Sequence, residues 1–310
     1  MIKAYKLIDL SGFFMSVLFI YALAAYPEIS INGAKDGLSL ALYTVFPSVF
    51  PFMVTAKYIM YSGYADKLSN LTDKIFKKAF NIPKGSSVAF LIGIISGYPI
   101  GGAVLSHLVN QKALTKDNAS VMLGYCNNSS PVFIIGTVGA IILKNVYAGY
   151  ILYGIHLISA FIVAFISRNK IAPQKHLKGQ TVKVTSSFTK AVSDSSISIL
   201  NISCYIVFFS VVSNLIIEIF KFNHFIPALF SGIIEISNGI KLISGISLTT
   251  PLKYAIISAL LGFSGLCVMF QTSAVVCKEN LSMKEYLKSK LLFAIISYAI
   301  SLIVFLLIKI

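Results

Sequence analysis

Glu235 is the residue with the clearest capacity for chemistry, because it is a carboxylate inside an otherwise apolar segment. Of the eleven acidic residues, it is the only one that lies well within such a segment. A carboxylate at bilayer depth costs at least about 2.5 kcal/mol on insertion scales, so we expect it to face a cavity or a partner. It could bind a cation or a solute, or exchange a proton; alternatively, it is a structural carboxylate that hydrogen-bonds to a broken helix. Asn238, about one helical turn away, could orient it.

Other polar side chains interrupt apolar segments at two further places. Four adjacent ones lie before Pro131 inside the segment 119–143, namely Asn127, Asn128, Ser129 and Ser130. Pro131 removes a backbone donor and frees a carbonyl upstream, so this group could coordinate a polar solute or a cation. The alternative is hydrogen bonding between helices, which Asn and Ser commonly provide in membranes. Gln271 is a weaker candidate, for which solute contact and helix packing are both open.

Glycines mark two positions at which the backbone of an apolar segment is expected to break. The first is the run 96–102, which contains Pro99 and the candidate site residues Ser96, Gly97, Gly101 and Gly102. The second is the pair Ser264 and Gly265. A break that faced lipid would leave backbone groups without hydrogen bonds. The breaks therefore predict a protein-lined cavity, which is typical of transporters and pores.

The sequence contains no motif of an enzyme, a nucleotide-binding loop or a metal site. The glycine-rich run lacks the Gly-Lys-Ser/Thr of a phosphate-binding loop, and neither G-x-S-x-G nor H-E-x-x-H occurs. The four cysteines form no C-x-x-C pair, and the four histidines have no metal-ligand spacing. His156, deep in a segment, is interpreted as a packing residue. We therefore predict that the protein is not an enzyme and has no cofactor and no metal centre.

The composition predicts an all-α polytopic membrane protein with the lipid bilayer as its partner. Hydrophobic residues make up 56% of the chain and charged residues only 12%. The net charge of +15 comes from lysines that fall mainly in loops, as the positive-inside rule expects, so we predict no nucleic-acid partner. The stretch 29–43 is too polar to span and is expected to be an amphipathic entry helix. About eight membrane segments are expected from the candidates 10–26, 44–62, 86–109, 119–143, 145–167, 197–218, 225–246, 251–276 and 289–308.

The basic linker 168–190 divides the chain into two membrane halves, 1–167 and 191–310, of one integrated domain. If this linker and the basic stretch 63–85 are both cytoplasmic, the chain must cross the membrane an even number of times between them. Three apolar segments lie there, so one must return on its own side. We predict that 86–109 is a re-entrant hairpin whose tip is the glycine-rich run.

The two halves resemble each other in a way that predicts an inverted repeat with a site at its midplane. Residues 95–97 parallel residues 263–265, and residues 34–36 parallel residues 192–194. Asp194, Ser195 and Ser196 would then form a helix N-terminus at the membrane edge. Strict inversion places the loop 278–290 outside, which conflicts with its four lysines.

Stretches around these breaks resemble the sporulation integral membrane protein family YlbJ, over roughly residues 32–308. The resemblance is carried, in order, by VFPSVFPF, SGYPIGGAVLSHLVNQKALTKDNA, CNNSSPVFIIGTVG, FSGIIEISNGIKLIS and LLGFSGLCVMFQTSAVV. Cys267 and Phe270 stand roughly where Pro99 and Gly102 stand in the first half. The second break is therefore expected to be less sharp.

The resemblance implies a nucleoside-recognition or Gate domain and a role in spore formation, specifically in assembly of the spore cortex. It also implies a multi-pass location in the bacterial inner membrane or a forespore-associated membrane. Because the resemblance supplies no substrate, the expected function is a transporter or gated pore for an unknown small polar or ionic solute. The alternative is a non-transporting scaffold in sporulation, and the possible protein partners are a second copy or other sporulation membrane proteins.

Overall fold

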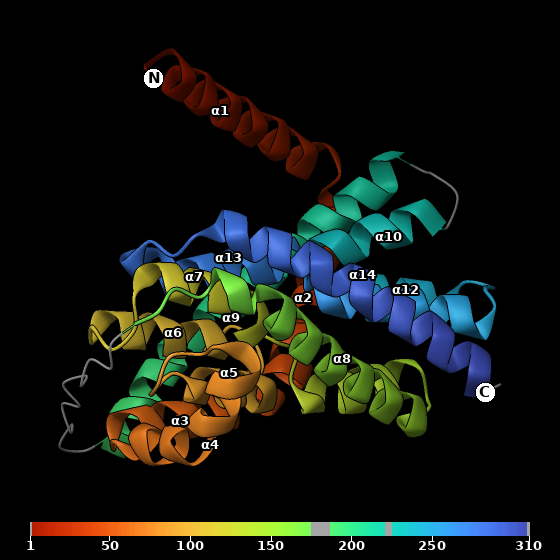
Figure 1. Cartoon of the computed structure of the whole chain (residues 1–310). Coiled ribbons are helices and arrows are strands. Elements are labelled where there is room, and N and C mark those ends of the chain that lie inside the picture. The colour runs from red at the N-terminus through yellow and green to blue at the C-terminus, as the bar shows by residue number, and fades with distance from the viewer. Residues whose placement is uncertain (1, 175–186, 221–224, 309–310) are drawn as a thin grey trace.

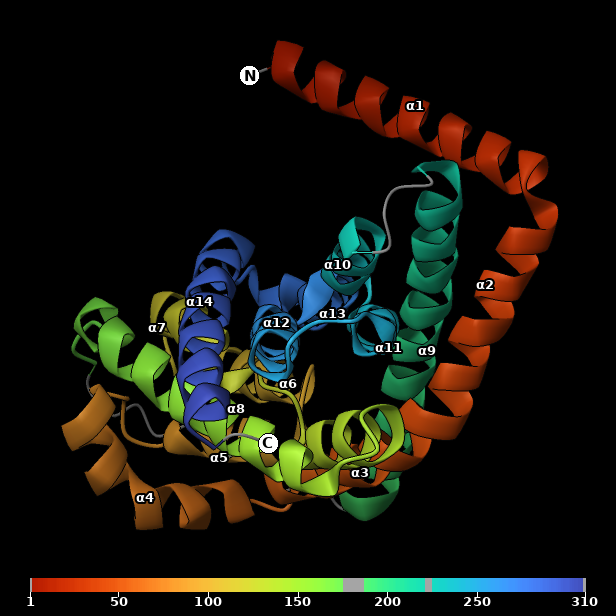
Figure 2. The same cartoon turned by 90° about the vertical axis from the view of Figure 1, so that its right-hand side faces the viewer.

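The computed structural model describes residues 2–174, 187–220 and 225–308, and every regular element in these ranges is a helix (Figure 1). The predicted all-α class is therefore confirmed. Helix α1 (Ile2–Ala25) extends away from the other helices (Figures 1 and 2). Its apolar side chains, such as Phe14 and Tyr21, are exposed. A helix that is apolar on its exposed faces is suited to contact with lipid.

The first half begins with one long helical stretch, Pro27–Tyr61. It comprises α2 (Pro27–Leu40), the π-helical η1 (Ala41–Val45) and α3 (Phe46–Tyr61). Residues 29–43 are thus part of a helix long enough to span a membrane, and not a separate entry helix. The reason lies in packing, because Gly33 and Gly37 lie directly against the backbone of α9 (Ser187–Phe220). Gly33, Gly37 and Ser30 are therefore buried against protein, whereas the polar Asn32, Lys35 and Asp36 stay exposed.

A helical hairpin and a broken helix come next in the first half. Helices α5 and α6 pack against each other, and residues 97–99 form the tip between them. Helices α7 and η2 are separated by residues 127–131, and both pack along α8. The elements after α3 are α4 (Tyr64–Phe80), α5 (Ser87–Ser96), α6 (Ile100–Asn110), α7 (Lys116–Cys126), η2 (Val132–Ile142), α8 (Val146–Ser167) and η3 (Arg168–Lys170).

The second half has the same order of a hairpin, a broken helix and a long helix. Helices α10 and α11 pack against each other with Glu235 at the tip, and α12 and α13 form a helix broken at Ser264. The predicted parallel between residues 95–97 and 263–265 is therefore wrong, because the first is a hairpin tip and the second is a break in a continuing helix. After α9 come α10 (Phe225–Ile234), α11 (Ile236–Gly245), α12 (Thr250–Phe263), α13 (Gly265–Val276), η4 (Cys277–Glu279) and α14 (Met283–Ile308).

Five helical stretches of the described chain are long and apolar enough to cross a membrane: Pro27–Tyr61, Val146–Lys170, Ser187–Ile219, Thr250–Glu279 and Met283–Ile308. The expected number of about eight is thus not confirmed. The segments predicted at 86–109, 119–143 and 225–246 consist of short helices, because glycine, proline and polar residues interrupt each of them. Two of these segments fold back as hairpins.

The connections between these helices gather at two ends of the molecule. At one end, Asn118 hydrogen-bonds to Ala172, and the N–H of Ser282 donates to Ser120. At the other end, Lys253 donates to the carbonyl of Ser244 on α11. In Figure 1, α5, α6 and α7 lie toward the left, whereas α10 and α12 lie toward the right. The two hairpins therefore enter the bundle from opposite ends.

Candidate functional site

The tip of the first hairpin packs against the break between α7 and η2. A Cβ atom at Gly93 or Gly101 would lie 1.7 or 1.9 Å from the carbonyl oxygen of Cys126, at the end of α7. Gly97, with a positive φ of 79°, lies close to Ser130. Only glycine allows this approach, because any side chain at these positions would overlap the backbone of the broken helix. The glycine-rich run thus brings one helix break against another.

Glu235 lies at the tip of the second hairpin as the N-cap of α11. Its Oε2 atom accepts a hydrogen bond of 2.8 Å from the N–H of Asn238, and the residue is only 3% exposed. This is the usual arrangement of a capping carboxylate. Gly239 lies against the backbone of Gly232, which lets α10 and α11 approach closely. Gly265, at the break of the other broken helix, faces the last carbonyls of α10.

A small cavity of about 50 Å³ lies between the two hairpin tips. This volume accommodates a few water molecules or one desolvated ion, and not an organic solute of ordinary size. The apolar part of its wall comes mainly from η1, α3 and α9. Its polar lining comes from Ser96, Gly97, Tyr98 and Ser130 in the first half, and from Glu235, Ser237, Cys267 and Gln271 in the second, with Ser48 on α3.

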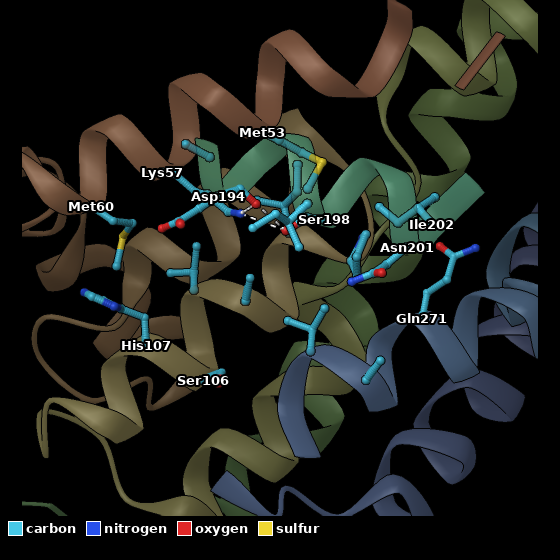
Figure 3. A pocket seen from close by; sticks show the side chains of 18 of the residues that line it. Met53, Lys57, Met60, Ser106, His107, Asp194, Ser198, Asn201, Ile202 and Gln271 are labelled. Atoms are coloured by element: carbon cyan, nitrogen blue, oxygen red, sulfur yellow. Dashed lines mark hydrogen bonds between the residues drawn. The ribbon is translucent and has the colours of Figure 1, made fainter. Parts of the chain in front are cut away.

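A second cavity of about 520 Å³ shares Gln271 and Ile202 with the small one (Figure 3). Its volume falls in the range of ordinary small-molecule sites. Figure 3 shows Gln271 and Asn201 at one end and His107 at the other. Since His107 belongs to the last turn of α6, this cavity runs from the hairpin tips toward the end of the molecule at which α6 and α7 connect.

One wall of the larger cavity carries a half-buried polar cluster between α3 and α9. Lys57 Nζ donates to the carbonyl of Asp194 at 2.6 Å and to Ser198 Oγ at 2.8 Å, and the Tyr61 hydroxyl donates to Asp194 Oδ2 at 2.6 Å. The interpretation of Asp194 as part of a helix N-terminus is wrong, because α9 begins at Ser187, about two turns earlier. The carboxylate instead joins two helices beside the cavity.

The break at residues 127–130 is held by hydrogen bonds to its freed backbone groups. Lys290 Nζ donates to the carbonyl of Asn127 at 2.5 Å, and the N–H of Ser129 donates to His156 Nε2 at 3.2 Å. The N–H of Phe133 donates to Ser130 Oγ at 3.2 Å. Non-helical backbone at membrane depth needs such partners. His156 is therefore more than a packing residue, because its imidazole accepts one of these backbone bonds.

The candidate residues predicted from the sequence separate into two groups in the structure. Five of them line the small cavity together, namely Ser96, Gly97, Ser130, Glu235 and Gln271. The others support the walls around it. Among these, Asn127 donates to Thr272 and Tyr286, Asn128 donates to the carbonyl of Tyr125, Ser129 donates to Tyr98, Asn238 donates to Ser210, and Gly101, Gly102, Ser264 and Gly265 lie at close helix contacts or breaks.

Several residues of this region were missed by sequence reasoning. Tyr98 lies between Pro99 and Gly97, so the glycine-rich run itself pointed to it. Lys57 lies within the predicted segment 44–62, and a lysine inside a membrane segment is a sequence signal of a functional site. The sequence predicts that Lys290 lies in the polar loop 278–290, whereas the structure places it on α14 and completely buries it. Its partner on α7 is distant in sequence, so no local pattern identifies the contact.

Most polar side chains around the small cavity carry oxygen atoms that could act as ligands. Glu235, four serines, Tyr98 and Gln271 suit a hard cation or a hydrogen-bonding solute better than a transition metal. Within the described ranges, no group of three or more His, Cys, Asp or Glu side chains is placed to hold a metal ion.

The comparisons with known proteins show what the sequence is similar to. Residues 42–144 match the family described as "Gate: Nucleoside recognition", a stretch that includes the first hairpin and the α7–η2 break. The chain is 24% identical to the sporulation integral membrane protein YlbJ of Bacillus subtilis (strain 168), over 86% of this chain and 76% of the relative. No solved structure matches the chain. The predicted resemblance is thereby confirmed: the chain is a multi-pass membrane protein that is similar to YlbJ, and residues 42–144 match the Gate family.

Proposed function

We propose that this protein is a transporter or gated pore for a small polar or ionic solute, and that it acts in spore formation. The observation that carries the proposal is the buried carboxylate of Glu235 in a cavity between two opposed hairpin tips. Gln271 connects this cavity to a larger one that reaches toward one end of the molecule. Broken backbone and a carboxylate at membrane depth are costly, and proteins retain them mainly along solute pathways.

The arrangement of the two halves supports a transport mechanism. Each half supplies a hairpin, a broken helix and a long helix in the same order, and the hairpins enter from opposite ends. We infer an inverted repeat, the architecture in which transporters place the substrate near the midplane. In this interpretation, the larger cavity is the access path from one side, and the tip of the second hairpin closes the other side.

The charge distribution suggests which side is accessible. The end of the molecule at which the larger cavity lies also carries α4 with its lysines, the α6–α7 connection and the start of α14. Lysines concentrate on the cytoplasmic side of membrane proteins. We therefore infer that the described conformation is open toward the cytoplasm and closed toward the opposite side.

The role in spore formation is proposed from the similarity to YlbJ, whose name describes a sporulation integral membrane protein. We place the role specifically in assembly of the spore cortex. A transporter could supply or remove a solute during that assembly, whereas a scaffold would act through its protein contacts alone.

A matched pair of carboxylate-to-amide substitutions tests the proposed site. Glu235→Gln keeps the size and part of the hydrogen bonding but removes the charge, and the exposed Glu28→Gln is the control. In sporulating cells with equal protein levels, we expect Glu235→Gln to produce heat-sensitive spores with a thin cortex and Glu28→Gln to produce normal spores. A normal cortex with Glu235→Gln would contradict the transport site and favour the scaffold. Metabolite profiles of the same strains would then indicate the class of solute.

A further inference from the structure

Lys290 is a fully buried ammonium group without a carboxylate partner among the residues that the structure describes. It lies on α14 with no exposed surface, and its ammonium donates a hydrogen bond of 2.5 Å to the carbonyl of Asn127. The ion pairs of α14 within the same residues are made by Glu285, with Lys170 and Lys288. Burying a charge without an opposite charge costs several kcal/mol, so the surroundings of Lys290 must stabilise it in another way.

The stabilisation comes from the end of a helix and from two aromatic rings. Asn127 is the C-cap of α7, where unpaired carbonyls and the helix dipole give a partial negative charge. The ammonium also lies 4.9 Å from the ring centroid of Phe293 and 5.6 Å from that of Tyr286. Both distances are within the range of cation–π attraction. Lys290 therefore lies in a site that is suited to a cation.

The contact between α7 and α14 brings Lys290 to this site. A Cβ atom at Gly124 would lie 2.2 Å from Cβ of Ser289, so glycine at this position allows α14 to approach closely. Tyr286, one turn before Lys290, accepts a hydrogen bond of 2.9 Å from the side-chain amide of Asn127. One turn of α14 thus contacts both the backbone and the side chain of the residue at the break.

The neighbouring His156 does not compete with Lys290 as the local cation. His156 accepts a hydrogen bond from the N–H of Ser129 through Nε2, so its imidazole is in the neutral form with a proton on Nδ1. Asn127 Oδ1 and Asn128 Oδ1 are buried and have no partner in the described part of the chain. The break therefore presents one backbone carbonyl to the ammonium and also holds two buried amide oxygens that the ammonium does not contact. Oxygens of both kinds are ligands that alkali cations also accept.

We propose that Lys290 is a tethered cation, whose ammonium occupies a monovalent-cation site at the α7–η2 break. Broken helices of transporters often coordinate a free sodium ion with the carbonyls at the end of a half-helix. Here the chain supplies the charge itself, so the break is held without a bound metal ion. Removing the side chain should expose a site that accepts a small free cation, and this expectation does not depend on the identity of the transported solute.

Thermal unfolding of the purified full-length protein tests the proposal. We expect Lys290→Ala to melt at a lower temperature than the wild type in choline chloride. Ethylammonium chloride or sodium chloride at equal ionic strength should restore much of the loss. The control is Lys288→Ala, which removes an exposed lysine of the same helix. The melting temperature of this variant, and that of the wild type, should be the same in all three salts. If Lys290→Ala melts at the same temperature in all three salts, the proposal is overturned.

A second comparison applies if Lys290→Ala does not accumulate in cells. Lys290→Arg keeps the positive charge, whereas Lys290→Met keeps an unbranched apolar chain without it. Accumulation of the Arg variant above the Met variant supports a cation at this position. Accumulation of the Met variant at or above the level of the Arg variant overturns it. Both Lys290 experiments measure stability, so a negative result in them would not contradict the proposal for Glu235. Likewise, a normal cortex with Glu235→Gln would not contradict the proposal for Lys290.

Discussion

Gly101→Ala should destabilise the contact between the first hairpin and the α7 break. The new Cβ atom would lie 1.9 Å from the carbonyl oxygen of Cys126, whereas ordinary contacts begin at 3.4 Å. Either the hairpin or the end of α7 must therefore move by about 1.5 Å. Because the obstructing atom belongs to the backbone, it cannot rotate away as a side chain could. Overpacking of this kind costs about 1 to 3 kcal/mol, and the rigid obstruction favours the upper end.

Gly154→Ala is the matched control, because Gly154 is also a helical glycine but lies in open space. Apart from the backbone of its own helix and its chain neighbours, no described atom lies within 4 Å of the position that its new methyl group would take. Alanine is favoured over glycine in a helix by about 1 kcal/mol, so this variant should be as stable as the wild type or slightly more stable. Because the gain in helix propensity applies to both glycines, the two Gly→Ala changes are expected to differ by about 1 to 3 kcal/mol.

Thermal unfolding in detergent measures this difference. At roughly 2 to 4 °C per kcal/mol, Gly101→Ala should melt about 2 to 12 °C below Gly154→Ala. If both variants melt at the wild-type temperature, the close contact between the hairpin and Cys126 does not exist as described. If Gly154→Ala melted at a lower temperature than the wild type, the space around Gly154 on α8 would not be open.

Two labelling experiments in a cysteine-free background test the topology and the cavity. Lys74→Cys and Lys284→Cys should react with a membrane-impermeant thiol reagent from the same face, and Lys144→Cys from the opposite face; any other pattern contradicts the two ends described above. Asn201→Cys, which lines the larger cavity, should react from the face of Lys284, whereas the buried Ser237→Cys should be protected. If Asn201→Cys and Ser237→Cys were labelled equally, the tip of the second hairpin would not be closed.

The breaks in the helices could be predicted from the sequence because their signals are local. Gly97, Pro131 and the polar residues between 127 and 130 interrupt apolar runs, and each marks a break in the structure. Glu235 was identified for the same reason. The path of the chain beyond a break could not be predicted in this way, because a hairpin tip and a kink have similar local sequences. Whether the flanking helices fold back depends on contacts such as that between Gly232 and Gly239.

Burial could be predicted less well than breaks, because it depends on partners that are distant in the chain. Lys290 comes after three other lysines within a short stretch, which suggests a polar loop when the sequence is read alone. The structure buries it because α14 packs against the end of α7. The stretch 29–43 shows this effect in part, since α9 covers Gly33 and Gly37, whereas the polar Asn32, Lys35 and Asp36 stay exposed.

The corrected position of the second hairpin also removes the conflict over the loop 278–290. If the segment 225–246 crossed the membrane, the two-fold plan would place these lysines on the face opposite to the linker 168–190. As a hairpin, α10–α11 returns to the end at which it began, and α12–α13 then carries the chain to the linker's own end. The hydrogen bond between Lys170 and Glu285 joins the two regions there. With the second hairpin at 225–246, the positive-inside rule and the proposed inverted repeat place the loop 278–290 on the same face. With the hairpin elsewhere, they placed this loop on opposite faces.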